Sequence, residues 1–174
     1  VSVNWNHDTC NRDCPFYNSG CYGDKGPSSW STTRQANAKR LALYRSNPAE
    51  YFERLESEIK RKKTPIEYVR VNGDGDTPDL QWAELFVAMA KRLPNTKFWV
   101  ATRKPFWNRV TLPENVVVRY SHGLQGHPHS SSVTTVAEEA TCPATVKGSG
   151  IHNCKECGHK CWSQRLLHVT YLKH

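Results

Sequence analysis

Seven cysteines, gathered near the two ends of a 174-residue chain, constrain this sequence more than any other feature. Three fall within residues 10–21 and four within residues 142–161, namely Cys10, Cys14, Cys21, Cys142, Cys154, Cys157 and Cys161. An odd number of cysteines does not suit the disulfide framework of a secreted domain. No secretory signal opens the sequence, so we expect a cytoplasmic protein whose clustered thiols stay reduced and bind metal.

The C-terminal cysteines have the spacing of a metal-binding knuckle. Cys154-x2-Cys157-x3-Cys161 places three thiols within eight residues, with gaps like those of bacterial ferredoxins. Cys142 is a natural fourth ligand that arrives from outside the knuckle. Tetrahedral zinc is the alternative to an iron–sulfur cluster, although a zinc ribbon normally has two C-x2-C pairs and this segment has one.

The N-terminal cysteines, Cys10-x3-Cys14-x6-Cys21, form a group of three. On a 4Fe-4S cluster, three thiolates leave one iron free to bind a substrate or a cofactor. On zinc, they would resemble a catalytic site with a bound water. Alternatively, these thiols share one centre with cysteines from the other end of the chain, so the sequence allows either one centre or two.

The pattern between the cysteines is that of an α/β protein. We expect helices at 31–46, 48–62 and 79–92, strands at 66–72, 97–102, 116–121, 133–137 and 166–172, and a loop at 122–132. Strands alternating with helices favour parallel pairing, and a full eight-stranded barrel usually needs ~250 residues. We therefore predict one domain, 1–174, with a partial barrel or small open, mostly parallel sheet. Metal would staple an N-terminal segment (1–30) and a C-terminal segment (142–174) onto it.

Polar residues follow three consecutive predicted strands. They are Asp74 and Asp76 after the first, Thr102, Arg103 and Lys104 after the second, and Ser121 and His122 after the third. Ligands of parallel sheets bind at the carboxyl ends of the strands, so we predict that these residues contact a cofactor or substrate. The alternative for Gly-Asp-Gly-Asp at 73–76 is an ordinary turn without a ligand.

Several motifs together resemble one family. Residues 10–16 (Cys-Asn-Arg-Asp-Cys-Pro-Phe) with 20–23 resemble its opening motif, and 142–145 (Cys-Pro-Ala-Thr) with 154–162 resemble its closing motif. Residues 70–76 and 102–105 resemble its strand-end elements. The family is that of the gene-product-88-like iron–sulfur proteins of phages and plasmids, which look similar to a truncated radical-SAM barrel.

The resemblance implies a protein of phage or mobile-element origin, in the cytoplasm of an infected or host bacterial cell. It also implies one or two 4Fe-4S clusters, with redox or radical-SAM-like chemistry. The radical-SAM pattern is C-x3-C-x2-C, and the last gap here is x6. This difference weighs against S-adenosylmethionine (SAM) as a cofactor.

A second interpretation is a zinc-stapled basic module that binds nucleic acid or a host protein. The net charge is +8, which suits an anionic partner. Aromatic and basic residues that can stack bases and neutralise phosphates are interleaved at Trp99, Arg103, Lys104, Phe106, Trp107, Arg109, Arg119 and Tyr120. The alternative for the aromatic rings is a place in the core. A third interpretation, a disulfide-bonded virion or secreted component, fits the odd cysteine count less well. No apolar run is long enough to span a membrane.

Overall fold

The protein is built around a six-stranded parallel sheet in which spatial order follows chain order, from β1 to β6. The computed structural model describes residues 1–17, 20–61, 63–121, 129–158 and 160–172. The strands are β1 (Ser2–Val3), β2 (Tyr68–Val71), β3 (Lys97–Thr102), β4 (Val116–Ser121), β5 (Ser130–Thr134) and β6 (His168–Leu172). The helices are α1 (Ser31–Ser46), α2 (Pro48–Lys60) and α3 (Leu80–Lys91). The predicted α/β class with an open parallel sheet is confirmed.

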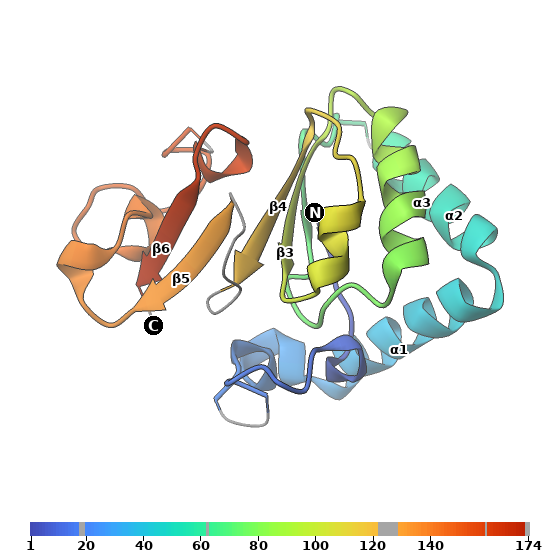
Figure 1. The fold of residues 1–174 in the computed structure, drawn as a ribbon, viewed down its shortest axis with the longest axis horizontal. Coiled ribbons are helices and arrows are strands. Elements are labelled where there is room, and N and C mark those ends of the chain that lie inside the picture. The colour runs from blue at the N-terminus through green and yellow to red at the C-terminus, as the bar shows by residue number, and fades with distance from the viewer. Residues whose placement is uncertain (18–19, 62, 122–128, 159, 173–174) are drawn as a thin grey trace.

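The main core lies between one face of the sheet and helices α2 and α3, which stand beside it in Figure 1. α2 buries apolar residues at helical spacing, which are Tyr51, Phe52, Leu55 and Ile59. The sheet contributes alternate residues of its central strands, which are Val69, Val71, Phe98, Val100, Val116 and Val118. Each fully buried side chain of this kind contributes about 1.5–3 kcal/mol, so this interface holds the central strands in place.

Polar side chains fix the starts of two helices. The Asn47 side chain accepts a hydrogen bond from the Glu50 N–H (3.1 Å) at the start of α2. The Asp79 side chain accepts one from the Trp82 N–H (2.8 Å) at the start of α3. Asp79 also accepts the Tyr44 hydroxyl of α1 (2.5 Å), and this ties α1 to the beginning of α3.

The opposite face of the sheet is covered in part by the C-terminal segment. Trp162 packs against Tyr68 of β2 and Trp99 of β3, with ring centroids 5.3 and 6.3 Å apart. A second, smaller cluster of buried residues forms there from Cys142, Cys161 and Val169. Two of the four C-terminal cysteines therefore belong to a small core that is separate from the main one.

The structure corrects three expectations about the elements. The strand predicted at 133–137 is β5 at Ser130–Thr134, and Ala137–Glu139 forms a 3-10 turn. The predicted loop at 122–132 is therefore wrong over 130–132, and 122–128 lie outside the described residues. β1 was not predicted; its two residues are too few to show alternation, and pairing with β2 defines it.

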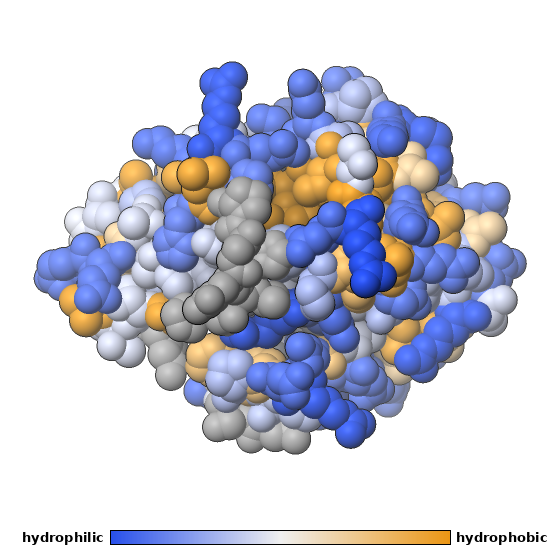
Figure 2. All heavy atoms as spheres, in the orientation of Figure 1, coloured by the Kyte–Doolittle hydropathy of each residue, from blue (hydrophilic) through white to orange (hydrophobic). Residues whose placement is uncertain are grey.

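The face of the molecule that Figure 2 shows is mainly hydrophilic. Figure 2 shows hydrophilic side chains over both ends of the visible face, while hydrophobic ones gather between the places that Figure 1 gives to β4 and α3. Among the helices of the described residues, none has the length and apolar character needed to cross a bilayer.

Candidate functional site

The N-terminal cysteines lie in the connection that follows β1, at the carboxyl edge of the sheet. In Figure 1 this segment runs below the ends of β3 and β4. Two bonds hold its first part against the loop after β2: the Trp5 N–H donates to the Asp74 carbonyl (2.9 Å), and the Asp76 N–H donates to the Thr9 hydroxyl (2.9 Å). Gly75, at φ +70°, allows the close approach, because a Cβ there would lie 2.6 Å from the Trp5 Cβ.

The three N-terminal thiols gather with the carboxylates of this loop. The electrostatic neighbours of Cys10, in falling order of effect, are Asp76, Cys21, Asp74 and Cys14. Burial first, and then these neighbours, raise the pKa of Cys10 to about 12. The pKa of Cys21 is also raised, chiefly by burial. A bound cation reverses this balance, because it stabilises the thiolates that the carboxylates disfavour.

A histidine that the motifs did not single out stands between two carboxylates beside these thiols. His7 Nδ1 lies 3.5 Å from Asp24 Oδ1, and His7 Nε2 lies 3.5 Å from Asp74 Oδ1. Nε2 is buried and makes no hydrogen bond among the described residues. Gly23 permits the contact, since a Cβ there would lie 2.2 Å from Asp74 Oδ1. The signal in the sequence was His7-x2-Cys10 and the Gly23 that follows Cys21 by two residues.

Asp76, predicted as a cofactor ligand, uses its carboxylate to join strand ends. Oδ1 accepts the Thr77 N–H (2.7 Å), the Thr102 hydroxyl (2.7 Å) and the Asn72 side-chain amide (3.3 Å), and Oδ2 accepts the Arg103 N–H (2.8 Å). Asp76 is 5% exposed to solvent. This is the turn interpretation of Asp76, and it leaves Asp74 as the loop carboxylate that lies beside His7.

The other predicted ligand residues reach the same edge. The Thr102 hydroxyl bonds Asp76, and the Lys104 N–H donates to that hydroxyl (2.9 Å). The Arg103 guanidinium lies over the Phe16 ring, 6.0 Å from its centroid, in the N-terminal cysteine segment. Ser121 ends β4 beside Ser131 of β5, and His122 lies outside the described residues.

The C-terminal cysteines gather in a separate place. Cys161 has the other three as electrostatic neighbours, which are Cys154, Cys142 and Cys157 in falling order of effect. Cys142 and Cys161 are buried, Cys157 is half-buried and Cys154 is exposed. Figure 1 places this segment beside β5 and β6, apart from the N-terminal one. The thiols therefore form a group of three and a group of four, and the structure does not bring all seven to one centre.

Neither group has the geometry of a formed metal site. Within the described part of the chain, no three His, Cys, Asp or Glu side chains are arranged to hold one ion. The donor chemistry fits iron or zinc, since clustered thiols are the preferred ligands of both. Binding of either metal requires the sulfur atoms of a group to move closer together.

Four of the eight interleaved aromatic and basic residues are buried. Trp107, Tyr120 and Trp99 are 2%, 5% and 5% exposed, and Trp107 Nε1 donates to the Thr77 hydroxyl (3.1 Å) inside the core. Arg119 is 0% exposed. These side chains cannot stack on bases in this fold, and the core interpretation of the rings holds.

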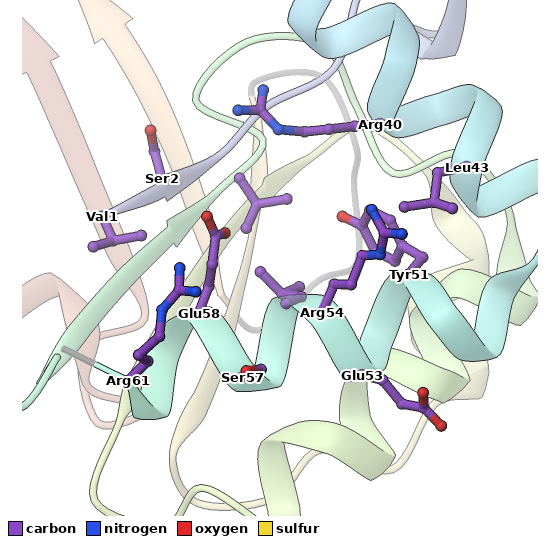
Figure 3. Close-up of a pocket in the computed structure, with 12 residues that line it drawn as sticks. Val1, Ser2, Arg40, Leu43, Tyr51, Glu53, Arg54, Ser57, Glu58 and Arg61 are labelled. Atoms are coloured by element: carbon purple, nitrogen blue, oxygen red, sulfur yellow. The ribbon is translucent and has the colours of Figure 1, made fainter.

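A pocket of about 540 Å³ lies elsewhere, between β1 and the helices α1 and α2. Figure 3 shows Glu58 of α2, Arg61 directly after this helix, Arg40 of α1 and Ser2 of β1 around it. None of the predicted site residues lines this pocket. It is therefore separate from both cysteine groups.

Comparison with known proteins gives one match. A sequence model of a protein family, described as gene product 88, matches residues 2–147. The matched region contains the three N-terminal cysteines and Cys142, and it ends before Cys154. No curated protein and no solved structure matches the chain.

Proposed function

The chain belongs to the gene product 88 family, and from this membership, which supports a phage-type protein, we propose that it binds an iron–sulfur cluster through Cys10, Cys14 and Cys21. The cluster would lie at the carboxyl edge of the parallel sheet, where α/β proteins bind their ligands.

One observation carries the proposal: three thiols on the connection after β1 are electrostatic neighbours of one another, and two of them, Cys10 and Cys21, are also neighbours of Asp74 on the loop after β2. The described parts of residues 10–21 consist of turns, a bend and irregular backbone, so the sulfur atoms are not fixed by a helix or a strand. Because the thiols are half-buried and soft, they suit iron or zinc better than calcium or magnesium. The resemblance of the cysteine motif favours iron–sulfur over zinc.

Three thiolates leave one iron of a four-iron cluster without a protein ligand. Such an iron supplies a binding position for a substrate or a cofactor such as SAM. Asp74 would then act as a hydrogen-bond acceptor for an amine or hydroxyl of that ligand, and His7 would hold its carboxylate in place. The x6 gap before Cys21 makes SAM the less favoured of these ligands.

Metal analysis after anaerobic purification tests the proposal. We expect about four irons and four sulfides per cluster, with broad visible absorption. In a Cys10→Ser, Cys14→Ser variant the iron and sulfide of this cluster should be lost. The matched control is Cys154→Ser, Cys157→Ser, which removes two thiols from the other group and should leave this cluster in place.

Two results would contradict the proposal. One is zinc without sulfide in the wild-type chain. The other is unchanged iron content and absorption in the Cys10→Ser, Cys14→Ser variant. Circular dichroism of each variant establishes that it is folded before its metal content is compared.

A second candidate, a zinc-stapled basic module that acts on nucleic acid, is favoured by one observation. On the face of the sheet opposite α2 and α3, the exposed Arg70 lies over the Trp99 ring, 4.8 Å from its centroid. The exposed Lys97 lies 5.9 Å from the centroid of Tyr68 on the same face. These two cations could contact phosphates without unfolding the core.

A further inference from the structure

A buried arginine stands beside the C-terminal cysteines and has no role in the proposed cluster site. Arg119 of β4 is 0% exposed. Its guanidinium donates to backbone carbonyl oxygens of the C-terminal segment, which are those of Cys161 (2.8 Å), Leu166 (2.8 Å), Ser163 (3.2 Å) and Leu167 (3.4 Å). In the part of the chain that the structure describes, no carboxylate forms an ion pair with Arg119.

A buried cation without an opposite charge is unfavourable, and proteins normally pair it. Carbonyl dipoles solvate the Arg119 guanidinium but leave its net charge in place. One of its hydrogen bonds goes to the Cys161 carbonyl (2.8 Å), and the thiol of that residue belongs to the group of four C-terminal cysteines. A metal centre whose thiolates carry a net negative charge would therefore lie beside this buried cation.

We propose that Cys142, Cys154, Cys157 and Cys161 form a second, closed metal centre with four thiolate ligands, and that Arg119 is its counter-charge. Zinc(II) with four thiolates and a four-iron cluster with four thiolates both carry two negative charges, so either would compensate the guanidinium. Each thiol loses its proton to solvent as its sulfur–metal bond forms. With all four positions filled by protein ligands, a zinc centre of this kind is structural.

Two of the four ligands are already held in place. The Cys142 N–H donates to the Thr170 carbonyl of β6 (3.0 Å), and the Cys161 carbonyl accepts from Arg119. Cys154 and Cys157 lie on an exposed turn that Asn153 and Glu156 stabilise through their side chains. Closure of the site therefore requires movement of this turn, while the sheet and Arg119 stay where they are.

Metal analysis in a suitable background tests this centre independently of the proposed N-terminal cluster. The background chain carries Cys10→Ser, Cys14→Ser and Cys21→Ser. We expect it to retain about one zinc, or about four irons with four sulfides, per chain. Either result supports the centre, and the sulfide content identifies the metal. Addition of Cys154→Ser and Cys157→Ser should remove it. A folded background chain that binds neither Zn²⁺ nor iron with sulfide would overturn the proposal.

The role of Arg119 is tested by Zn²⁺ affinity in the same background. In competition with a chelator, the Arg119→Gln variant should bind Zn²⁺ more weakly than its parent, by a factor of about ten or more. Outer-shell partners contribute to metal affinity on this scale. The matched control is Arg70→Gln, which removes an exposed arginine of the same sheet face and should leave the affinity unchanged. Equal affinity of the Arg119→Gln variant and its parent would refute the counter-charge.

A measurement on the wild-type chain covers the case in which Arg119→Gln does not fold. The chain is alkylated with iodoacetamide before and after loading with Zn²⁺, and the cysteine peptides are quantified by mass spectrometry. We expect Zn²⁺ to protect Cys142, Cys154, Cys157 and Cys161 together, and a chelator to restore their alkylation. Equal alkylation rates of these four thiols with and without Zn²⁺ would exclude the centre.

Discussion

At the residue scale, the two aspartates of the loop after β2 have different tasks. Asp76 accepts four hydrogen bonds from Asn72, Thr77, Thr102 and Arg103 and joins the ends of β2 and β3. Asp74 bonds the Gly75 N–H (2.9 Å) within its own loop and faces His7. Two residues of the same type, two positions apart, thus serve the fold and the candidate site respectively.

This difference predicts unequal effects of the same substitution. Asp76→Asn places an amide N–H against buried donors, and we expect it to lower the free energy of unfolding by about 2–4 kcal/mol. Asp74→Asn keeps the loop bond to an oxygen, and we expect a loss below about 1 kcal/mol. Urea unfolding followed by circular dichroism measures both values. Equal losses would show that the two carboxylates are not divided in this way.

Sequence reasoning identified the ligand-type residues of the candidate site but missed the residues that support them. The cysteines, Asp74 and the ends of β3 and β4 stand out by type and position. His7 and Gly23 gain their roles only when the loop after β2 packs against the first segment. Arg119 had a signal, a charged residue within the apolar strand Val-Val-Val-Arg-Tyr-Ser, but its position there also fits a surface strand.

At the element scale, segments with clear composition and clear ends were the ones that the sequence predicted best. The helix at 31–46 and the strands at 97–102 and 116–121 have the predicted bounds. The helix lies between Ser31 and the Asn47-Pro48 pair, and the two strands are short runs rich in β-branched and aromatic residues. β5 could not be read in this way. Its Ser130, Ser131 and Ser132 are all polar, and Ser131 is buried by its neighbours β4 and β6 rather than by its own character.

An ion-pair cluster connects α2 with the end of α3. Glu56 accepts hydrogen bonds from Arg92 Nη2 (2.6 Å) and from Lys60 Nζ (2.6 Å). The bond from Arg92, and then that from Lys60, hold the pKa of Glu56 below its ordinary value of 4.5. A carboxyl whose pKa is lowered by folding stabilises the protein above its ordinary pKa, and this stabilisation is lost as the pH falls through the lowered value.

We therefore predict a pH-dependent effect of Glu56→Gln. At neutral pH the variant should lose about 0.5–1 kcal/mol, since Arg92 and Lys60 are largely exposed to solvent. The difference from wild type should shrink as the pH falls from 4.5 toward about 3. Urea unfolding across this range is the measurement, and Glu53→Gln, at an exposed position of the same helix, is the control. A difference that stays constant with pH would contradict the assignment.

At the scale of the whole molecule, contact with an anionic partner depends more on where the positive side chains lie than on the net charge. Arg70 and Lys97 lie on the sheet face opposite α2 and α3, whereas Arg45 and Arg54 lie on α1 and α2. Substitution of either pair by glutamine removes the same net charge. Only the first pair lies beside the aromatic side chains Trp99 and Tyr68.

If the basic sheet face contacts nucleic acid, the two pairs differ in their effect on DNA binding. Arg70→Gln with Lys97→Gln should weaken binding of labelled duplex DNA and reduce the salt slope of the affinity by about 2. Arg45→Gln with Arg54→Gln should change the slope little. A fluorescence titration at several salt concentrations measures both. The same reduction of the salt slope for both pairs would mean that DNA binding does not depend on this face of the sheet. No DNA binding by the wild-type chain would rule out the second candidate function.

The agreement between spatial order and chain order in the sheet has a consequence for synthesis on the ribosome. Every strand pairs with the one made just before it, so the sheet can grow one strand at a time as the chain emerges, N-terminal part first. β4 emerges long before the segment 161–167, in which four backbone carbonyl oxygens accept hydrogen bonds from Arg119. The guanidinium therefore stays hydrated on the nascent chain, and it is buried only when the last cysteine has left the exit tunnel.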